Sequence, residues 1–194
     1  MRKLHKIQNA MRLFSLTTLL CLSFAFKSFA QEAKINWMTI EEVTVAMEKE
    51  PRNVMIDVYT SWCGPCKMMM ANTFTNKNLI NYVNKNYYAV KLNAEAPDPI
   101  VFLGKTYTNP TYDPNKRGRN GVHELSRYFK VSAYPTIVYL DEEMKIITAN
   151  SGYKQPQQLE VMLKFFNDVY SREIPSDNVQ SVWDKYNSTF TGTW

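Results

Sequence analysis

The chain has 194 residues and a formal net charge of +5, with 23 Lys or Arg against 18 Asp or Glu. The whole excess lies in the first thirty residues, which hold five basic side chains and no acidic one. The rest of the chain is formally neutral, so we expect it to bind neither nucleic acid nor an acidic membrane surface. It has no repeat or low-complexity tract and is long enough for one domain with a substantial core.

The first thirty residues have the pattern of a secretory signal peptide. Basic residues between Arg2 and Arg12 precede an apolar run from Leu13 to Phe26, which is long enough for a signal and short for a membrane span. Ser28-Phe29-Ala30 offers a cleavage site and predicts a mature start near Gln31. We therefore expect a periplasmic or secreted protein without stable membrane insertion after cleavage.

Two alternatives for this leader stay open. Lys27 places a charge between the apolar run and the cleavage site, which favours an uncleaved anchor. Cys21 suggests a lipoprotein, although Leu20 stands where a small residue would be expected. Either alternative would keep the protein attached to a membrane.

From Thr39 on, helical and strand patterns alternate. Thr39 and Glu42 form a capping box that starts a helix, which ends before Pro51. The next elements in chain order are a strand at 53–60, helices at 65–74 and 76–85, and a strand at 87–93. The strand at 53–60 is apolar enough to be buried on both faces of a sheet, and Asp57 interrupts it.

Residues 95–121 differ from the segments on either side. They hold four prolines and the basic run Lys116-Arg117-Gly118-Arg119, and a short hairpin at 100–107 is the regular structure we expect there. Loops of this length in compact domains tend to be functional or disordered. The basic run is either a solvated loop or a surface that contacts a partner.

The remaining elements complete an α/β pattern. We expect a helix at 122–130 with Leu125, Tyr128 and Phe129 facing inward, strands at 137–140 and 144–149, a break at 150–152 and a long helix at 155–170. After Pro175, a last short helix is expected to pack on the domain, with docking of a partner as the alternative. The order of elements predicts a mixed central sheet with helices on both faces.

Cys63 and Cys66 are the only cysteines after the leader, and they lie where the strand at 53–60 gives way to a helix. At a helix N-terminus, unpaired N–H groups and the helix dipole favour a thiolate over a thiol. A disulfide that closes so short a loop constrains the unfolded chain little, which disfavours a structural staple. Zinc wants about four ligands, and only His123 adds to the two cysteines, so we expect no metal.

These residues resemble a known family. Trp62-Cys63-Gly64-Pro65-Cys66-Lys67 matches the active-site motif of thioredoxins, in the strand-to-helix context that this fold requires. Tyr134-Pro135-Thr136 stands just before a strand, where the family carries a cis-proline. Asp57 matches the family's buried acid, and Lys91 lies in a stretch that resembles the one supplying its lysine partner. The resemblance covers residues 39–170.

The resemblance implies a thioredoxin-like fold and a simple domain organisation. We expect a signal peptide at 1–30, a thioredoxin-like domain at 31–170 that carries a long loop insertion at 95–121, and a C-terminal helical extension at 171–194. The leader, the insertion and the extension lie outside the thioredoxin pattern, so the family predicts nothing about them.

The resemblance also implies a thiol:disulfide oxidoreductase that needs no cofactor. Cys63 is the expected nucleophile, which forms a mixed disulfide, and Cys66 is the less exposed resolving cysteine. Asp57, with its pKa raised by desolvation, would accept the proton of Cys66. Pro135 would be cis and face the dithiol. These four residues form the expected catalytic set.

The substrate surface implied by the family comprises Trp62, Gly64, Pro65 and the backbone of Tyr134. Among relatives, Gly-Pro between the cysteines goes with a reducing couple, near the lower end of a range of roughly −270 to −120 mV. Tyr134 instead resembles the Tyr-Pro-Thr of disulfide isomerases. The two features point to opposite directions of electron flow.

We therefore predict a secreted reductase of protein disulfides that is re-reduced by a membrane electron donor. An oxidase or isomerase is the alternative within the class. A binding or chaperone module with the same fold is the alternative outside it, although such a module would not need the dithiol, Asp57 and Pro135 together.

Overall fold

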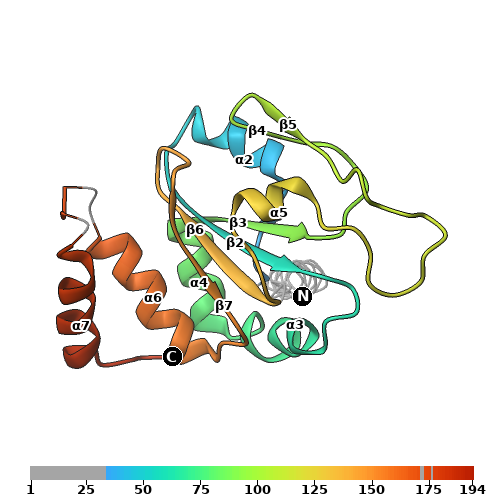
Figure 1. Cartoon of the computed structure of the whole chain (residues 1–194). Coiled ribbons are helices and arrows are strands. Elements are labelled where there is room, and N and C mark those ends of the chain that lie inside the picture. The colour runs from blue at the N-terminus through green and yellow to red at the C-terminus, as the bar shows by residue number, and fades with distance from the viewer. Residues whose placement is uncertain (1–33, 171–172, 176) are drawn as a thin grey trace, which may run out of the picture. The chain divides into compact units, whose positions relative to one another are not determined.

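A five-stranded mixed sheet carries the fold (Figure 1). In this computed structural model β2 (Asn53–Tyr59) pairs in parallel with β3 (Tyr87–Asn93), which pairs in parallel with β1 (Trp37–Met38). On its other edge β2 pairs antiparallel with β6 (Thr136–Leu140), and β6 pairs antiparallel with β7 (Ile146–Ser151). The spatial order is β1-β3-β2-β6-β7, which confirms the mixed sheet expected from the sequence.

The structure describes residues 34–170, 173–175 and 177–194, which belong to one compact unit. The predicted signal peptide at 1–30, together with its cleavage site, lies outside the described residues. Within the described ranges, no helix is long and apolar enough to cross a membrane.

Helices cover both faces of the sheet, as predicted. On one face lie α4 (Lys77–Asn86), α6 (Pro156–Asp168) and the π-helical turn η1 (Met69–Thr73). On the other face lie α2 (Ile40–Met47) and α5 (Glu124–Tyr128). The capping box expected at the start of α2 is present, since Thr39 Oγ1 accepts from the Glu42 amide at 3.1 Å and the Glu42 carboxylate accepts from the Thr39 amide at 2.8 Å.

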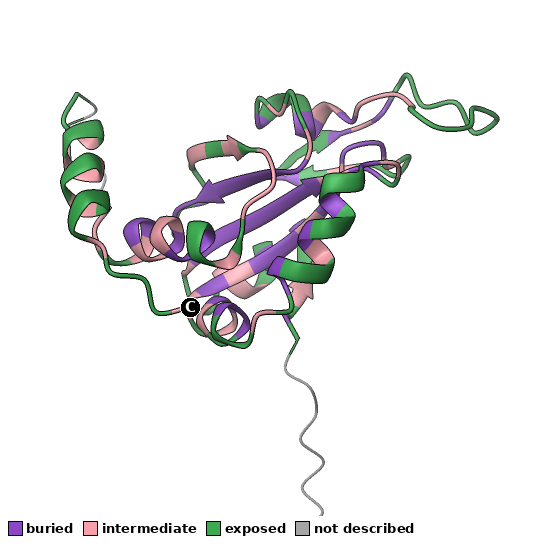
Figure 2. Ribbon diagram, turned by 90° about the horizontal axis from the view of Figure 1, so that it is seen from below, coloured by how far each residue is buried: buried purple, intermediate pink, exposed green. Residues whose placement is uncertain are grey.

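The alternation of side chains along β2 divides the core in two. Successive residues of a strand point to opposite faces of a sheet. Met55 accordingly packs in the core beneath α4 and α6, while Val54, Ile56 and Val58 pack in the core beneath α2 and α5. Figure 2 shows the central strands buried along most of their length. Asp57 shares the parity of Met55 and therefore lies on the α4–α6 face of the sheet.

The helix predicted at 122–130 is shorter in the structure. His123 caps α5, because its Nδ1 accepts the Leu125 amide at 3.1 Å, and its ring is fully buried. Leu125 and Phe129 are buried as expected. The inward placement of Tyr128 was wrong: it is 43% exposed, because α5 ends at this residue.

The edge strand β7 lies two residues further along the chain than the predicted strand at 144–149. Met144 has a φ of 61° and belongs to the turn between β6 and β7. Asp141 stabilises this turn, because its carboxylate accepts a hydrogen bond from the Lys145 amide at 2.9 Å. The expected break at 150–152 was wrong in its first two positions, since the strand continues through Ser151. Gly152, with a φ of 90°, follows the end of the strand.

The segment 95–121, predicted from the sequence to be an insertion, contains the predicted hairpin. β4 (Ile100–Phe102) pairs antiparallel with β5 (Lys105–Tyr107), and the turn between them uses positive φ at Leu103 and Gly104. The ring centroid of Phe102 lies 5.3 Å from that of Phe129, the C-cap of α5, which fixes the hairpin to the domain. After β5 the chain forms a long loop that extends away from the sheet before it returns to α5 (Figure 1).

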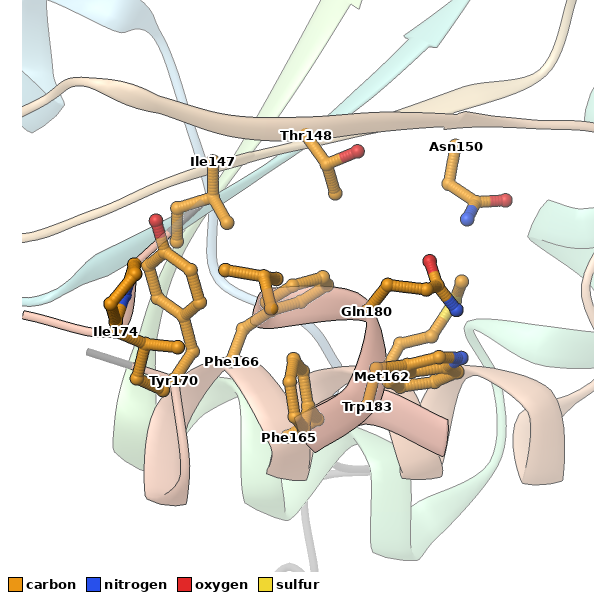
Figure 3. Close-up of a pocket in the computed structure, with 12 residues that line it drawn as sticks. Ile147, Thr148, Asn150, Met162, Phe165, Phe166, Tyr170, Ile174, Gln180 and Trp183 are labelled. Carbon is orange, nitrogen blue, oxygen red and sulfur yellow. The ribbon is translucent and has the colours of Figure 1, made fainter. Parts of the chain in front are cut away.

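The C-terminal tail forms α7 (Val179–Thr189) and packs on the domain, as predicted. The Phe165 ring on α6 contacts the rings of Trp183 and Tyr186 on α7, at centroid distances of 5.0 and 5.5 Å. Between β7, α6 and α7 lies a pocket of about 600 Å³ (Figure 3). None of the site residues predicted from the sequence lines this pocket.

Candidate active site

The two cysteines form a disulfide at the start of α3 (Gly64–Met68). Cys63 is the N-cap of this helix, and its Sγ accepts a hydrogen bond from the Cys66 amide at 3.1 Å. Pro65 occupies the first turn, where a missing N–H costs no helical hydrogen bond. The sulfur of Cys63 therefore lies at a helix N-terminus, whose amide N–H groups and dipole attract negative charge.

The expected difference in exposure between the cysteines is absent in this disulfide form. Cys63 is 3% exposed and Cys66 is 4% exposed. Gly64 and Pro65 between them are exposed, and a side-chain carbon added at Gly64 would meet nothing within 4 Å. The open surface around the disulfide is thus formed by the two residues between the cysteines, where a substrate chain has room to approach.

Asp57 is a buried carboxylate in the middle of β2. Its side chain is 2% exposed, its Oδ2 lies 3.7 Å from Lys91 Nζ, and its Oδ1 has no hydrogen-bond partner in the described structure. Burial raises the pKa of Asp57 to about 6, and the charge and hydrogen bonding of Lys91 lower it by less. Such a group is mostly ionised at neutral pH and still basic enough to accept a proton.

Lys91 is the neighbour of Asp57 across the parallel β2–β3 pair. Its ammonium lies over the Tyr59 ring at 4.5 Å and over the Trp37 ring at 5.4 Å, and it also donates to Met70 Sδ. The family resemblance suggested Lys91 as the partner of Asp57. In the structure its charge is held between aromatic rings and points to Asp57.

The Tyr134–Pro135 peptide bond is cis, as the resemblance implied. Pro135 is buried and directly precedes β6. The ring of Tyr134 meets the ring of Trp62 edge to face, with centroids 5.8 Å apart. The structure therefore brings the residue before the proline next to the residue before Cys63.

Glu95 is a site residue that the sequence analysis missed. Both of its carboxylate oxygens accept from Trp62 Nε1, at 2.9 and 3.0 Å, and Oε1 also accepts from the Asn120 amide at 2.8 Å. Its side chain is buried. A glutamate at the start of an irregular insertion carries no local signal, because its partners lie 25 and 33 residues away in the chain.

The basic run of the insertion lies partly at this site. The guanidinium carbon of Arg119 is 4.6 Å from the centre of the Trp62 ring, a cation–π contact. Lys116 and Arg117 are exposed on the same loop. Of the three basic side chains, Arg119 is the one that contacts the active-site motif.

The described part of the chain offers no cluster of three or more His, Cys, Asp or Glu side chains able to hold a metal ion. His123, the one further zinc ligand weighed from the sequence, has both ring nitrogens engaged. Nδ1 accepts from Leu125, and Nε2 lies 3.1 Å from the Asp98 carbonyl oxygen. His123 therefore has a structural role as a helix cap.

Residues 40–167 of this chain match the sequence model of a protein family described as "Thioredoxin-like domain". The chain belongs to the thioredoxin-like family. With its Cys63–Cys66 disulfide it is a thiol:disulfide oxidoreductase of this family.

Other proteins resemble the chain more distantly. The thiol:disulfide interchange protein DsbD of Pectobacterium atrosepticum is 25% identical over 130 residues, which cover 66% of this chain and 19% of DsbD. The chain thus spans about a fifth of the length of this relative.

Solved structures agree on the fold. A thioredoxin-fold protein from Helicobacter pylori superposes with a TM-score of 0.51 at 16% identity, covering 84% of this chain and 99% of its own. A putative disulphide-isomerase from Bacteroides thetaiotaomicron gives a TM-score of 0.50 at 21% identity, covering 73% and 100%. At these identities the likeness shows the thioredoxin-like fold alone.

Proposed function

We propose that the protein is a reductase of protein disulfides that works outside the cytoplasm and receives its electrons from a membrane protein. The observation that carries the proposal is the Cys63–Cys66 disulfide at the start of α3, with Gly64 and Pro65 exposed between the two cysteines. The similarity to part of a thiol:disulfide interchange protein supports it. The signal-peptide pattern of the leader supports the location.

In the reduced protein, the Cys63 thiolate attacks one sulfur of a substrate disulfide. A bond forms between Cys63 and that sulfur, the substrate S–S bond breaks, and the other substrate sulfur leaves as a thiolate. Cys66 then attacks the Cys63 sulfur, which re-forms the Cys63–Cys66 disulfide and releases the second thiolate. The substrate gains two electrons and two protons, and the dithiol loses them to reach the oxidised form described above.

Asp57 serves the second attack in this scheme. Cys66 must lose its proton before it becomes a nucleophile, and a carboxylate with a pKa of about 6 is suited to accept it. Lys91 keeps Asp57 from being protonated at neutral pH, because its charge lowers the pKa that burial raises. Asp57 is thus the general base, and Lys91 sets its protonation.

The proposed substrate surface consists of Trp62, Gly64, Pro65 and the backbone of Tyr134. Trp62 and Tyr134 lie edge to face, so their rings border one continuous surface beside the dithiol. An extended substrate segment would pair with the backbone before the cis peptide bond and place its cysteine over Cys63. Pro135 shapes this surface.

One observation favours electron flow in the opposite direction. Tyr134 before the cis-proline favours an oxidase or isomerase, whereas Gly64-Pro65 favours a reductase. The reduction potential of the Cys63–Cys66 couple decides between them: a value near −270 mV supports the reductase, and one roughly 100 mV or more higher supports the oxidase.

Insulin reduction with dithiothreitol as electron donor tests whether the protein turns over at all. We expect activity in the wild type and its loss in Cys63→Ser and Cys66→Ser. If all three proteins are equally inactive, the chain is a binding module of this fold and the proposed function is wrong.

A further inference from the structure

The side chain of Trp62 is held by residues of the insertion. Glu95 accepts its indole N–H, Asn120 binds the same carboxylate, and the Arg119 guanidinium lies over its ring. On a further side Tyr134 contacts the ring edge to face. The residue that directly precedes Cys63 is therefore oriented by side chains of the segment 95–121, far from it in the chain.

These contacts leave an open pocket of about 390 Å³ beside the disulfide motif. Trp62, Tyr134, Glu95, Arg119 and Asn120 line it, together with residues of the segment that joins α5 to β6. Its size is that of a site for a side chain or a short peptide segment. The pocket exists because residues 95 and 119–120, at the two ends of the insertion, meet at Trp62.

The pocket is lined by one carboxylate, Glu95, and one guanidinium, Arg119, which form no ion pair with each other. The Glu95 carboxylate is buried and already accepts from Trp62 and Asn120. The Arg119 side chain is exposed, and no acidic group of the described chain forms an ion pair with it. A planar guanidinium with free N–H donors matches the two oxygens of a carboxylate.

We propose that Arg119 and this pocket form a subsite for an acidic side chain, Asp or Glu, located a few residues from the disulfide of a polypeptide substrate. The inference rests on the proposed function, since it places the substrate sulfur at Cys63. A residue two or three positions from that sulfur lies within roughly 10 Å along an extended chain. Trp62 is adjacent to Cys63, so a residue at this distance reaches Arg119.

The acidic residue would bind through charge and geometry together. Its carboxylate would accept from the N–H groups of Arg119, whose guanidinium lies over the Trp62 ring. This cation–π contact restricts the guanidinium, so less freedom is lost when a carboxylate binds. The insertion would thereby select among disulfides that the dithiol alone cannot distinguish.

The test uses the full chain carrying Cys66→Ser, in which Cys63 forms stable mixed disulfides. Two peptides, each closed by one disulfide, differ only in a Glu or a Lys two positions from a cysteine. We expect Cys63 to react about fivefold faster with the Glu peptide at low salt. With Arg119→Gln added, the ratio of the two rates should fall to near one, and with Arg119→Glu it should invert.

The ratio separates selectivity from structural damage, because a damaged site would slow both peptides alike. Arg117→Gln is the matched control, since it removes a neighbouring charge without touching Trp62, and it should keep the parent ratio. Equal rates for the two peptides in the parent, or an unchanged ratio in Arg119→Gln, would overturn the inference.

An uncharged small disulfide, bis(2-hydroxyethyl) disulfide, distinguishes failure of the subsite from failure of the proposed function. If it reacts with Cys63 while the two peptides react alike, only the subsite is wrong. If neither this compound nor the peptides form an adduct with the Cys66→Ser protein, the proposed function is wrong, and the proposed subsite is then wrong as well.

Discussion

Lys91 Nζ lies 3.7 Å from Asp57 Oδ2, across two neighbouring parallel strands and beneath the ring of Tyr59. The carboxylate is 2% exposed, and the lysine reaches it from a partly exposed position. The positive charge of Lys91 offsets only part of the effect of burial on Asp57, since the pKa of Asp57 is still raised from 3.8 to about 6. The native protein therefore holds this proton more tightly than the unfolded chain does.

Asp57→Asn should stabilise the oxidised protein at pH 8 and not at pH 3. A carboxyl whose pKa is raised by folding stabilises the fold while it is protonated, and this contribution is lost as the pH rises from 3.8 through about 6. The shift corresponds to about 3 kcal/mol. Urea unfolding at several pH values measures it: the variant should gain on the wild type by up to that amount between pH 3 and pH 8. A difference that does not vary with pH would contradict the assignment.

Lys91→Met is the companion prediction. Removing the positive charge leaves burial unopposed, so the pKa of Asp57 should rise above 6. Carbon NMR of the Asp57 carboxyl, followed from pH 4 to pH 9, reports this directly. The reaction of Cys66 should then require a higher pH, because more of Asp57 is protonated at pH 7. An unchanged midpoint would mean that Lys91 does not act on Asp57.

Cys66→Ser should trap substrates as mixed disulfides on Cys63. The first attack remains possible, but no second thiolate is present to resolve the product. Cell extracts run on non-reducing gels should show adducts that dithiothreitol removes, and mass spectrometry should place them on Cys63. The matched control is Cys63→Ser, in which Cys66 should trap far less because it lies inside α3 and not at the N-cap. If the Cys66→Ser variant forms no adducts in cell extracts, this result would count heavily against the proposal that the substrates are proteins.

The parts of this site that the sequence predicts are those with a local cause. The dithiol falls between an apolar strand and a helix, and Asp57 interrupts a run that must be buried, so both positions follow from neighbouring residues. The hairpin at 100–107 is likewise predicted from a local feature, because Gly104 favours the turn between its two strands. The cis bond before Pro135 came from the family resemblance, because nothing in the residues around it specifies the isomer.

The parts that the sequence does not predict depend on contacts between distant residues. Glu95 meets Trp62 across 33 positions, and Glu160 meets Thr193 across the same separation. Strand β1 is two residues long, too short to show a pattern, and it forms because β3 offers a free edge. Tyr128 fits an inward helical face, yet α5 ends there and leaves it at the surface.

Gly121→Ala should displace the insertion from Trp62. A Cβ at position 121 would lie 2.5 Å from the carbonyl carbon and oxygen of Thr111, closer than backbone atoms tolerate. The neighbouring Asn120 amide should then lose its bond to Glu95, which also holds Trp62. We expect faster hydrogen exchange at the Trp62 indole N–H, measured by NMR. We also expect a changed set of trapped proteins while insulin reduction persists; loss of both activities would instead mean that the loop is structural.

Glu160 holds the C-terminus of the chain. Its buried carboxylate accepts from the Thr193 amide at 2.9 Å, the Trp194 amide at 3.0 Å and Lys164 Nζ at 2.7 Å. Burial would raise the pKa of Glu160, but the hydrogen bonds from Lys164, Thr193 and Trp194 outweigh it and hold the pKa below 4.5. A lowered pKa stabilises the fold above the unfolded value, and this stabilisation is lost as the pH falls.

Glu160→Gln should therefore destabilise the protein at pH 7 by about 1 to 3 kcal/mol, because an amide cannot accept all these hydrogen bonds and leaves Lys164 without its ion pair. The cost should be smaller at pH 3 than at pH 7, because protonation of the wild-type carboxylate weakens the same contacts. Urea unfolding at both pH values measures it. Glu143→Gln is the matched control, since it breaks an exposed pair with Lys145 and should cost no more than about 0.5 kcal/mol. Equal costs for the two variants would show that the C-terminal residues are not held by Glu160.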